Sequence, residues 1–317
     1  MRLILKHKKY ILSLIGCLLF AIGLQGQQDA QYTQYMYNTI AINPAYAGAR
    51  GALSIAALHR SQWIGLDGAP VTQTFNIHSP ISSKSGLGIS IVNDEIGNGT
   101  NQDTYIDAQY SYTVKTSGKG KLSFGLKAGG HFLNIDYNKL RANNPTVAPP
   151  NNGVDKQFSP NFGAGLYYHE DKFYLGLSVP NFLETEHFDD SSGNNTYLTK
   201  ERINWYLITG YIFNLNSDLK MKPATLLKTV YGAPVQVDLS TTFLYKDKFS
   251  MGLAYRWDAA LSALIGIQAT DRLMLGLAYD KETTALGGTN FNDGSFEVFL
   301  RYDFKSKFRN ALTPRFF

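Results

Sequence analysis

Five of the six histidines lie beyond the first 27 residues, and they are the residues of this sequence best suited to acid–base chemistry or metal binding. They are spread along the chain without any HxxxH or HExxH pair: His59, His78, His131, His169 and His187. Protein zinc sites draw on closely spaced histidine and cysteine ligands, so this spacing gives a metal site no local support. No GxSxG elbow, Walker loop or dinucleotide fingerprint stands in a usable context either. We therefore predict that the protein is not an enzyme and binds neither a cofactor nor a metal.

A second set of candidate residues is charged and falls on the polar face of alternating segments. Its members are Asp107, Lys127, Asp238, Arg256, Asp280, Glu297, Arg301 and Asp303. Such residues could select a solute or bind a partner segment inside a pore. In a membrane barrel they more often pair across a wet or plugged interior. Because the two signs nearly balance, without a ring of one sign, we expect pairing.

The elements that must position these residues follow a two-residue period. Between Tyr105 and Val114, and again between Leu122 and Phe132, apolar residues alternate with polar or very small ones. This pattern predicts β-strands with one apolar face. Repeated along the chain, it predicts fourteen strands. They begin near Ala52, Val71, Gly86, Thr104, Leu122, Asn161, Phe173, Arg202, Leu219, Val235, Phe249, Ala260, Leu273 and Ser295.

The connections between these strands alternate in length. Six links, the first of them between strands two and three, are short and turn-like, whereas links one/two, three/four, five/six, seven/eight and thirteen/fourteen are longer. An even strand count with long and short loops on opposite sides is the pattern of an outer-membrane barrel. A secreted β-sandwich also alternates, but its polar face would be rich in Lys and Glu. Here that face is rich in Gly, Ser, Asn and Gln. We predict an all-β, transmembrane, antiparallel up-and-down barrel with short periplasmic turns and longer extracellular loops.

The first 27 residues have the composition of a secretory signal peptide. A basic start with Arg2, Lys6, Lys8 and Lys9 precedes an apolar run of about 15 residues, short for a spanning helix of roughly 20. The lone cysteine, Cys17, lies in this run, so the mature chain is expected to lack disulfides. Removing four basic residues from 30 leaves 26 against 25 acidic ones, which gives no reason to expect a nucleic-acid partner.

Residues 28–51 fit no strand period, although they are rich in tyrosine and contain an Asn43-Pro44 turn. We expect this segment to start in the periplasm and either to enter the barrel as a plug or to dock against its base. The predicted barrel then covers residues 52–304, and residues 305–317 form a basic periplasmic tail.

Two stretches, "QYTQYMYN…INPAYAGARG" and "HRSQWIGLDGAPVTQTF", resemble the start of the PorP/SprF family of Bacteroidota outer-membrane proteins. "LGLSVPNFL", "MGLAYRW" and "LGLAYDKETTALGG" resemble later family segments in the same order. The positions carried over, as partner-binding or plug residues, are Tyr32, Tyr35, Asn43, Pro44, Ala45, Gly48, Arg60, Gln62, Trp63, Gly65, Gly68, Ala69 and Pro70.

The resemblance implies a non-enzymatic outer-membrane barrel of the type IX secretion system, which exports cargo carrying C-terminal signals. It implies support for export or for surface anchoring of large adhesins, as in gliding motility. The implied partners are outer-membrane lipid, periplasmic ring components and lipoproteins of that system, and the C-terminal domain of a secreted cargo or adhesin. A general or solute-specific porin is the main alternative. A barrel enzyme built on His131 is a third.

Overall fold

The computed structural model describes residues 31–136, 138–141, 154–183, 186–189, 196–200, 202–289 and 292–304. The predicted signal peptide, the tail from residue 305 and residues 28–30 lie outside this range. So do most of the five/six link and the side chain of His187. Among the described residues, no helix combines the length and apolar character needed to cross a membrane.

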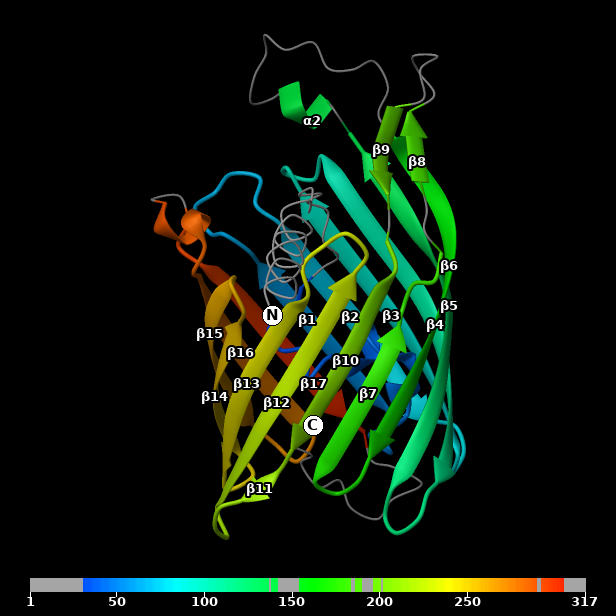
Figure 1. Ribbon diagram of the computed structural model, residues 1–317, viewed down its shortest axis with the longest axis vertical. Helices are drawn as coiled ribbons and strands as arrows, with labels where there is room; N and C mark the ends of the chain where they lie inside the picture. Colours follow the sequence, from blue (N-terminus) through cyan, green and yellow to red (C-terminus); the bar gives the residue numbers. More distant parts are fainter. Residues whose placement is uncertain are drawn as a thin grey trace, which may run out of the picture.

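Fourteen antiparallel strands form a closed barrel, which confirms the predicted fold class (Figure 1). The sheet closes because β1 pairs with β17 as well as with β2. The wall strands are β1 (Ser54–Ser61), β2 (Val71–Pro80), β3 (Ser85–Ile96), β4 (Asn101–Lys115), β5 (Lys121–Ile135), β6 (Val154–His169), β7 (Phe173–Val179), β10 (Asn204–Tyr211), β12 (Leu219–Val230), β13 (Gln236–Tyr245), β14 (Phe249–Arg256), β15 (Ala260–Gln268), β16 (Leu273–Glu282) and β17 (Ser295–Asp303).

Smaller elements lie at the two ends of the barrel. At the long-loop end are a separate hairpin, β8 (Glu186–Asp189) with β9 (Thr196–Lys200), and two short helices, α2 (Asn138–Arg141) and η4 (Ala285–Gly288) (Figure 1). At the short-turn end, β11 (Phe213–Asn214) extends the sheet beside β12.

Two features differ from the sequence prediction in detail. The three/four link is a four-residue turn, Gly97–Thr100, because β3 and β4 continue their ladder through polar residues that the apolar period did not reveal. For the same reason β6 begins at Val154 rather than near Asn161. Pro223 lies inside β12. On one side, β12 pairs with β11 up to Met221 and with β10 from Ala224 onward. Pro223 lies in the gap between these two pairings, where a missing backbone donor is tolerated.

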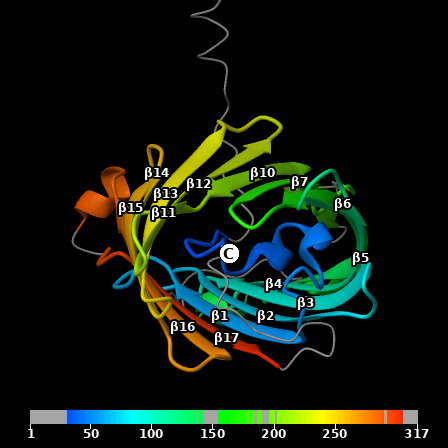
Figure 2. The same ribbon diagram turned by 90° about the horizontal axis from the view of Figure 1, so that it is seen from below.

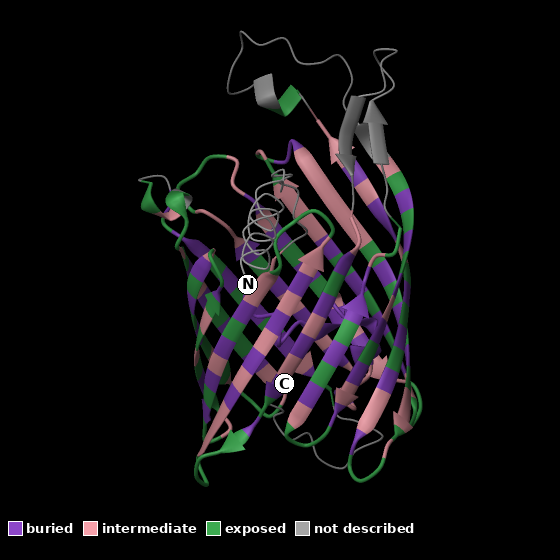
Figure 3. Ribbon diagram, viewed as in Figure 1, coloured by how far each residue is buried: buried purple, intermediate pink, exposed green. Residues whose placement is uncertain are grey.

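Burial is inverted relative to a soluble protein. Along β5, Leu126 points outward and is 64% exposed, while Lys127 points into the lumen and is 6% exposed. Figure 3 shows the same alternation as bands along the wall strands that face the viewer. The outer face is therefore the apolar surface that lipid covers, and the polar residues face the interior.

Candidate plug and partner-binding site

The lumen is occupied by the N-terminal segment, residues 31–53, which lies inside the ring of strands (Figure 2). We call this segment the plug. It contains two single-turn helices, η1 (Thr39–Ala41) and η2 (Pro44–Tyr46). Asn43 begins η2 by accepting a hydrogen bond from the Ala45 amide at 3.0 Å, and Pro44 fits the first helical position, which needs no donor. The local sequence therefore makes compact turns rather than a strand.

The plug runs down the lumen from the long-loop half to the short-turn end. Near its start, Gln31 Oε1 accepts a bond of 2.9 Å from Arg256, the last residue of β14 at the long-loop end. Near its finish, Arg50 pairs with Asp303 at the opposite end of the barrel. The described part of the segment therefore starts in the long-loop half, whereas the sequence led us to expect a start on the short-turn side. Periodicity carries no information on chain direction inside a lumen.

A buried charge cluster holds the upper part of the plug. The guanidinium of Arg60 lies 2.7 Å from Asp280 Oδ2 and 3.3 Å from Glu297 Oε2. Glu297 accepts the backbone amides of Thr33 at 2.9 Å and Gln34 at 2.8 Å, and the Thr33 hydroxyl donates to Asp280 at 2.6 Å. Since Arg60 is only 1% exposed, these charges depend on one another and on the plug for their hydrogen bonds.

A second cluster fixes the end of the plug. Arg50 donates through Nε and Nη2 to the two Asp303 oxygens at 3.0 and 2.8 Å, a bidentate arrangement. Arg301 Nε lies 3.4 Å from the same carboxylate. The neighbouring backbone is tied as well, because the Phe304 amide donates to the Leu53 carbonyl at 2.8 Å. The chain is thus anchored where the plug becomes β1.

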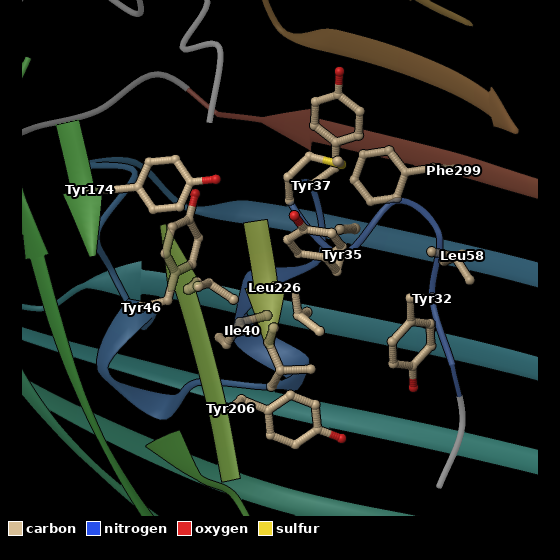
Figure 4. Packing of buried hydrophobic residues seen from close by; sticks show 14 of the residues in the cluster. Tyr32, Tyr35, Tyr37, Ile40, Tyr46, Leu58, Tyr174, Tyr206, Leu226 and Phe299 are labelled. Atoms are coloured by element: carbon tan, nitrogen blue, oxygen red, sulfur yellow. The ribbon is translucent and has the colours of Figure 1, made fainter. Parts of the chain in front are cut away.

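Aromatic packing fills the space between the two charge clusters (Figure 4). Tyr37 stacks on Phe299 with ring centroids 5.7 Å apart, and Tyr46 meets Tyr167 edge-on at 5.3 Å. The tyrosines of the opening segment thus form a hydrophobic core inside the barrel.

Polar groups of the wall satisfy the plug backbone. Ser178 donates to the Ile42 carbonyl at 2.7 Å, and Ser111 to the Ala47 carbonyl at 2.6 Å. The Gly48 amide donates to His78 Nδ1 at 3.1 Å. Irregular backbone inside a barrel needs such partners because an unpaired buried amide or carbonyl is costly. Ser111 and Ser178 were not among the candidate residues, and His78 was one only as a possible acid–base or metal-binding histidine, since single serines and histidines on a polar face carry no pattern that predicts a bond to the plug.

Small residues in the wall make room for the plug. A Cβ atom on Gly125 would lie 2.1 Å from the Ala45 amide nitrogen, and one on Gly86 would lie 2.3 Å from the Ala47 carbonyl oxygen. On Gly165 it would lie 2.2 Å from Asn43 Oδ1. Real Cβ atoms do not approach backbone so closely, so the polar-face glycines are part of the plug's docking surface.

The motif positions separate into two groups, one inside the lumen and one on the long-loop rim. Tyr32, Tyr35, Asn43, Pro44, Ala45 and Gly48 belong to the plug, and Arg60 reaches into the lumen to meet it. Gln62, Trp63, Gly65, Gly68, Ala69 and Pro70 instead form the loop between β1 and β2 at the long-loop rim. The structure therefore joins Arg60 to the first group and not to its sequence neighbours.

The rim loop, residues 62–70, links three connections of the barrel. The Ile64 amide donates to Gly294 and the Asp293 amide to Ile64, while the Gly97 amide donates to Gly68. Trp63 adopts a left-handed φ of 45°, and its indole Nε1 donates to Glu282 at 3.1 Å. These contacts hold the loop in one defined shape on the surface of the rim.

The other lumen charges predicted from the sequence pair across neighbouring strands. Arg256 Nε lies 3.0 Å from Asp238, and Lys127 Nζ lies 2.9 Å from Asp107. His131 is held by Asp103 at 2.7 Å and stacks on Tyr105 with centroids 4.4 Å apart. Within the described part of the chain, no group of three His, Cys, Asp or Glu residues is arranged to hold a metal ion.

A closed antiparallel barrel with an even strand number, an apolar outer face and a filled polar lumen defines a bacterial outer-membrane protein. The chain belongs to the family of type IX secretion system membrane proteins PorP/SprF, whose model matches residues 24–302. That membership confirms the resemblance found in the sequence, and it points to the outer membrane together with the fold.

Solved structures share the barrel fold at low sequence identity. The Ralstonia pickettii toluene transporter TbuX matches with a TM-score of 0.50 and 9% identity, over 84% of this chain and 93% of that chain. The Acinetobacter baumannii outer membrane protein Omp33 gives a TM-score of 0.46 at 8% identity, over 80% and 98% of the two chains. At these identities the likeness concerns the fold alone. No match was found among curated proteins.

Proposed function

We propose that the protein is a non-enzymatic outer-membrane component of the type IX secretion system that supports the export or surface anchoring of C-terminal-signal cargo, such as large adhesins of the gliding-motility type. Family membership supports the system to which it belongs. The plug supports a role as a scaffold rather than a pore, because it occupies the lumen with the chain's own tyrosines and ion pairs. A barrel filled in this way is suited to hold partners at its two ends.

The proposed partners meet the barrel at different ends. Outer-membrane lipid surrounds the apolar wall after the signal peptide has been removed. Periplasmic ring components and lipoproteins of the secretion system would meet the short-turn end. The C-terminal domain of a cargo or adhesin would meet the long-loop end, where the rim loop is tied by backbone hydrogen bonds and exposes Ile64 and Leu66.

The proposal is tested by deleting the gene and comparing the secreted proteins and surface adhesins by mass spectrometry. Particular C-terminal-signal cargo should disappear from the surface or the medium, and the wild-type gene should restore it. A second complementation uses the rim variant Trp63→Ala, which leaves the plug contacts intact. Loss of cargo with normal amounts of barrel in the membrane supports recognition at the rim. An unchanged secretome in the deletion strain contradicts the proposal.

A general or solute-specific porin is the alternative function, motivated by the polar lumen. The purified protein in planar bilayers distinguishes the two. The filled lumen leads us to expect little or no steady conductance from the wild-type protein, whereas a porin conducts. A barrel enzyme would instead lose hydrolytic activity on His131→Ala, and we expect no activity to lose. The burial of His131 and its contacts with Asp103 and Tyr105 support the structural role that we propose for it.

A further inference from the structure

A lysine, an aspartate and an asparagine meet in the lumen close to the point where β7 ends. Lys127 Nζ lies 2.9 Å from Asp107 Oδ2 and 2.8 Å from Asn181 Oδ1. Lys127 and Asp107 are buried, and Asn181 is half-buried. A primary amine thus stands beside a carboxamide, with a carboxylate placed to take up the amine protons. A nucleophile, an electrophilic carbon and a proton carrier are the groups from which a new amide bond can form.

The lysine and the asparagine belong to parts of the wall that no pair of neighbouring strands joins. Lys127 on β5 pairs with Gly163 on β6, and Gly163 lies one step beyond the last pair between β6 and β7. After β7 ends at Val179, residues 180–183 continue the wall without forming a strand. Because Gly163 has no side chain, this segment packs against β6, and a Cβ atom there would lie 2.1 Å from the Pro180 carbonyl oxygen. The lysine can therefore reach across β6 to the next segment.

The surrounding structure holds the reacting groups in place. Leu183, two residues after Asn181, donates its amide to Asn161 Oδ1 at 3.2 Å and accepts a bond from Asn161 Nδ2 at 3.1 Å. Asp107 is confined as well, because a Cβ atom on Gly129 would lie 2.2 Å from its Oδ1. Groups held in contact in this way react as if each were present at an effective concentration of about 10⁵–10⁸ M in the best cases. A slow reaction between an amine and an amide can then proceed within the folded chain.

We propose that Lys127 and Asn181 become joined by an isopeptide bond that the folded barrel forms on itself. Lys127 passes a proton to Asp107, and the lone pair freed on Nζ forms a bond with Asn181 Cγ. The Cγ–Nδ2 bond then breaks. Of the three protons of the lysine ammonium, one stays on the new amide, and Asp107 carries the other two in turn to the departing nitrogen, which leaves as ammonium. No group is oxidised or reduced, so the reaction needs no co-reactant.

The bond would close the wall covalently at the place where strand pairing stops. It would tie β5 to residues 180–183 across β6, whose ladder with β7 has already ended at that level. The plug does not take part in it, because Lys127 contacts Asn181 and Asp107. The inference concerns the chain alone and does not depend on the proposed function.

The test is mass spectrometry of tryptic peptides from the full-length protein purified from its native membrane. Residues 122–139, uncut after Lys127, should be recovered joined to residues 173–200, which contain Asn181. The joined peptide should be lighter than the two free peptides together by one molecule of ammonia. The link must be located on peptides because a terminal glutamine also loses ammonia when it cyclises. Cleavage after Lys127, together with an unlinked peptide containing Asn181, would overturn the proposal.

Refolding shows whether the folded barrel makes the bond. Residues 28–317, collected as inclusion bodies and dissolved in urea, should carry no link, and the joined peptide should appear only after folding into detergent micelles. Asp107→Ala should slow its appearance by about 10²–10⁴-fold, the usual contribution of general acid–base catalysis. Lys228→Arg, at another buried lumen lysine, should leave the rate unchanged.

Two further variants and one control complete the test. Lys127→Arg and Asn181→Ala should each fold without forming the link. The rates are compared only for the fraction of each variant that shows the folded-barrel shift on gels, so that a failure to fold is not counted as a lost bond. A joined peptide that forms at the wild-type rate in Asp107→Ala would refute the role of Asp107. A link already present in the urea-dissolved chain would refute its formation by the folded barrel.

Discussion

Removal of Arg60 should release the upper part of the plug, because this side chain is the counter-ion of two buried carboxylates. In Arg60→Ala, Asp280 and Glu297 would face each other in the lumen without a positive partner, and Glu297 would no longer be held in place to accept the Thr33 and Gln34 amides. Breaking a buried ion pair by removing one partner costs about 3–5 kcal/mol. Since each 1.4 kcal/mol is a factor of ten, the undocked population should rise roughly 10²- to 10⁴-fold.

Thiol labelling measures that population directly. Met36 is 3% exposed inside the plug, and the only cysteine of the sequence lies in the predicted signal peptide, so Met36→Cys supplies a single buried thiol. Its reaction with a maleimide should follow the undocked fraction and accelerate when Arg60→Ala is added. Planar bilayers should then show a conductance that the wild-type barrel lacks.

Two further variants make the interpretation specific. Lys127→Met also leaves a buried carboxylate, Asp107, without its cation, but Lys127 binds Asn181 rather than the plug, so labelling should not change. Neutralising the whole cluster with Arg60→Met, Asp280→Asn and Glu297→Gln removes the uncompensated charge and should slow labelling again. Slow, wild-type-like labelling in Arg60→Ala would refute the argument that this cluster holds the plug.

Three other changes test the packing of the plug and the rim. Gly125→Ala places a methyl group against the Ala45 backbone and should lower the melting temperature of the barrel by several degrees, for a cost of about 1–3 kcal/mol, whereas Gly288→Ala, which meets open space, should not. Asn43→Ala removes the cap of η2 and should cost about 1–2 kcal/mol, read as faster labelling of the buried thiol. Gly68→Ala, at a φ of 75° and against Gly97, should increase proteolysis of the rim loop while leaving the thiol protected.

The strand pattern was predictable because it is imposed by the membrane. Lipid outside and a polar interior force the side chains to alternate along each wall strand, so every strand start except that of β6 could be placed from the sequence to within about three residues. The prediction failed where the wall no longer contacts lipid and the side chains need not alternate between apolar and polar. Beyond the apolar band, β3 and β4 continue as polar strands up to Gly97–Thr100, and periodicity alone represented them as a long loop.

The sequence by itself predicted export, and it determined that the chain forms a barrel of fourteen strands and belongs with type IX secretion proteins, since composition, period and motif order can be read along the chain. Only the tertiary structure decided what the opening segment does. Tyr37 meets Phe299, and Thr33 meets Glu297, across more than 260 residues of sequence, and no period in the chain encodes such pairs. It also divided one continuous motif, placing Arg60 with the plug and Trp63 on the rim. Along a wall strand, successive side chains point alternately into the lumen and out of it, which directs Arg60 inward. Side chains of a loop do not follow this alternation, so Trp63 can lie on the rim.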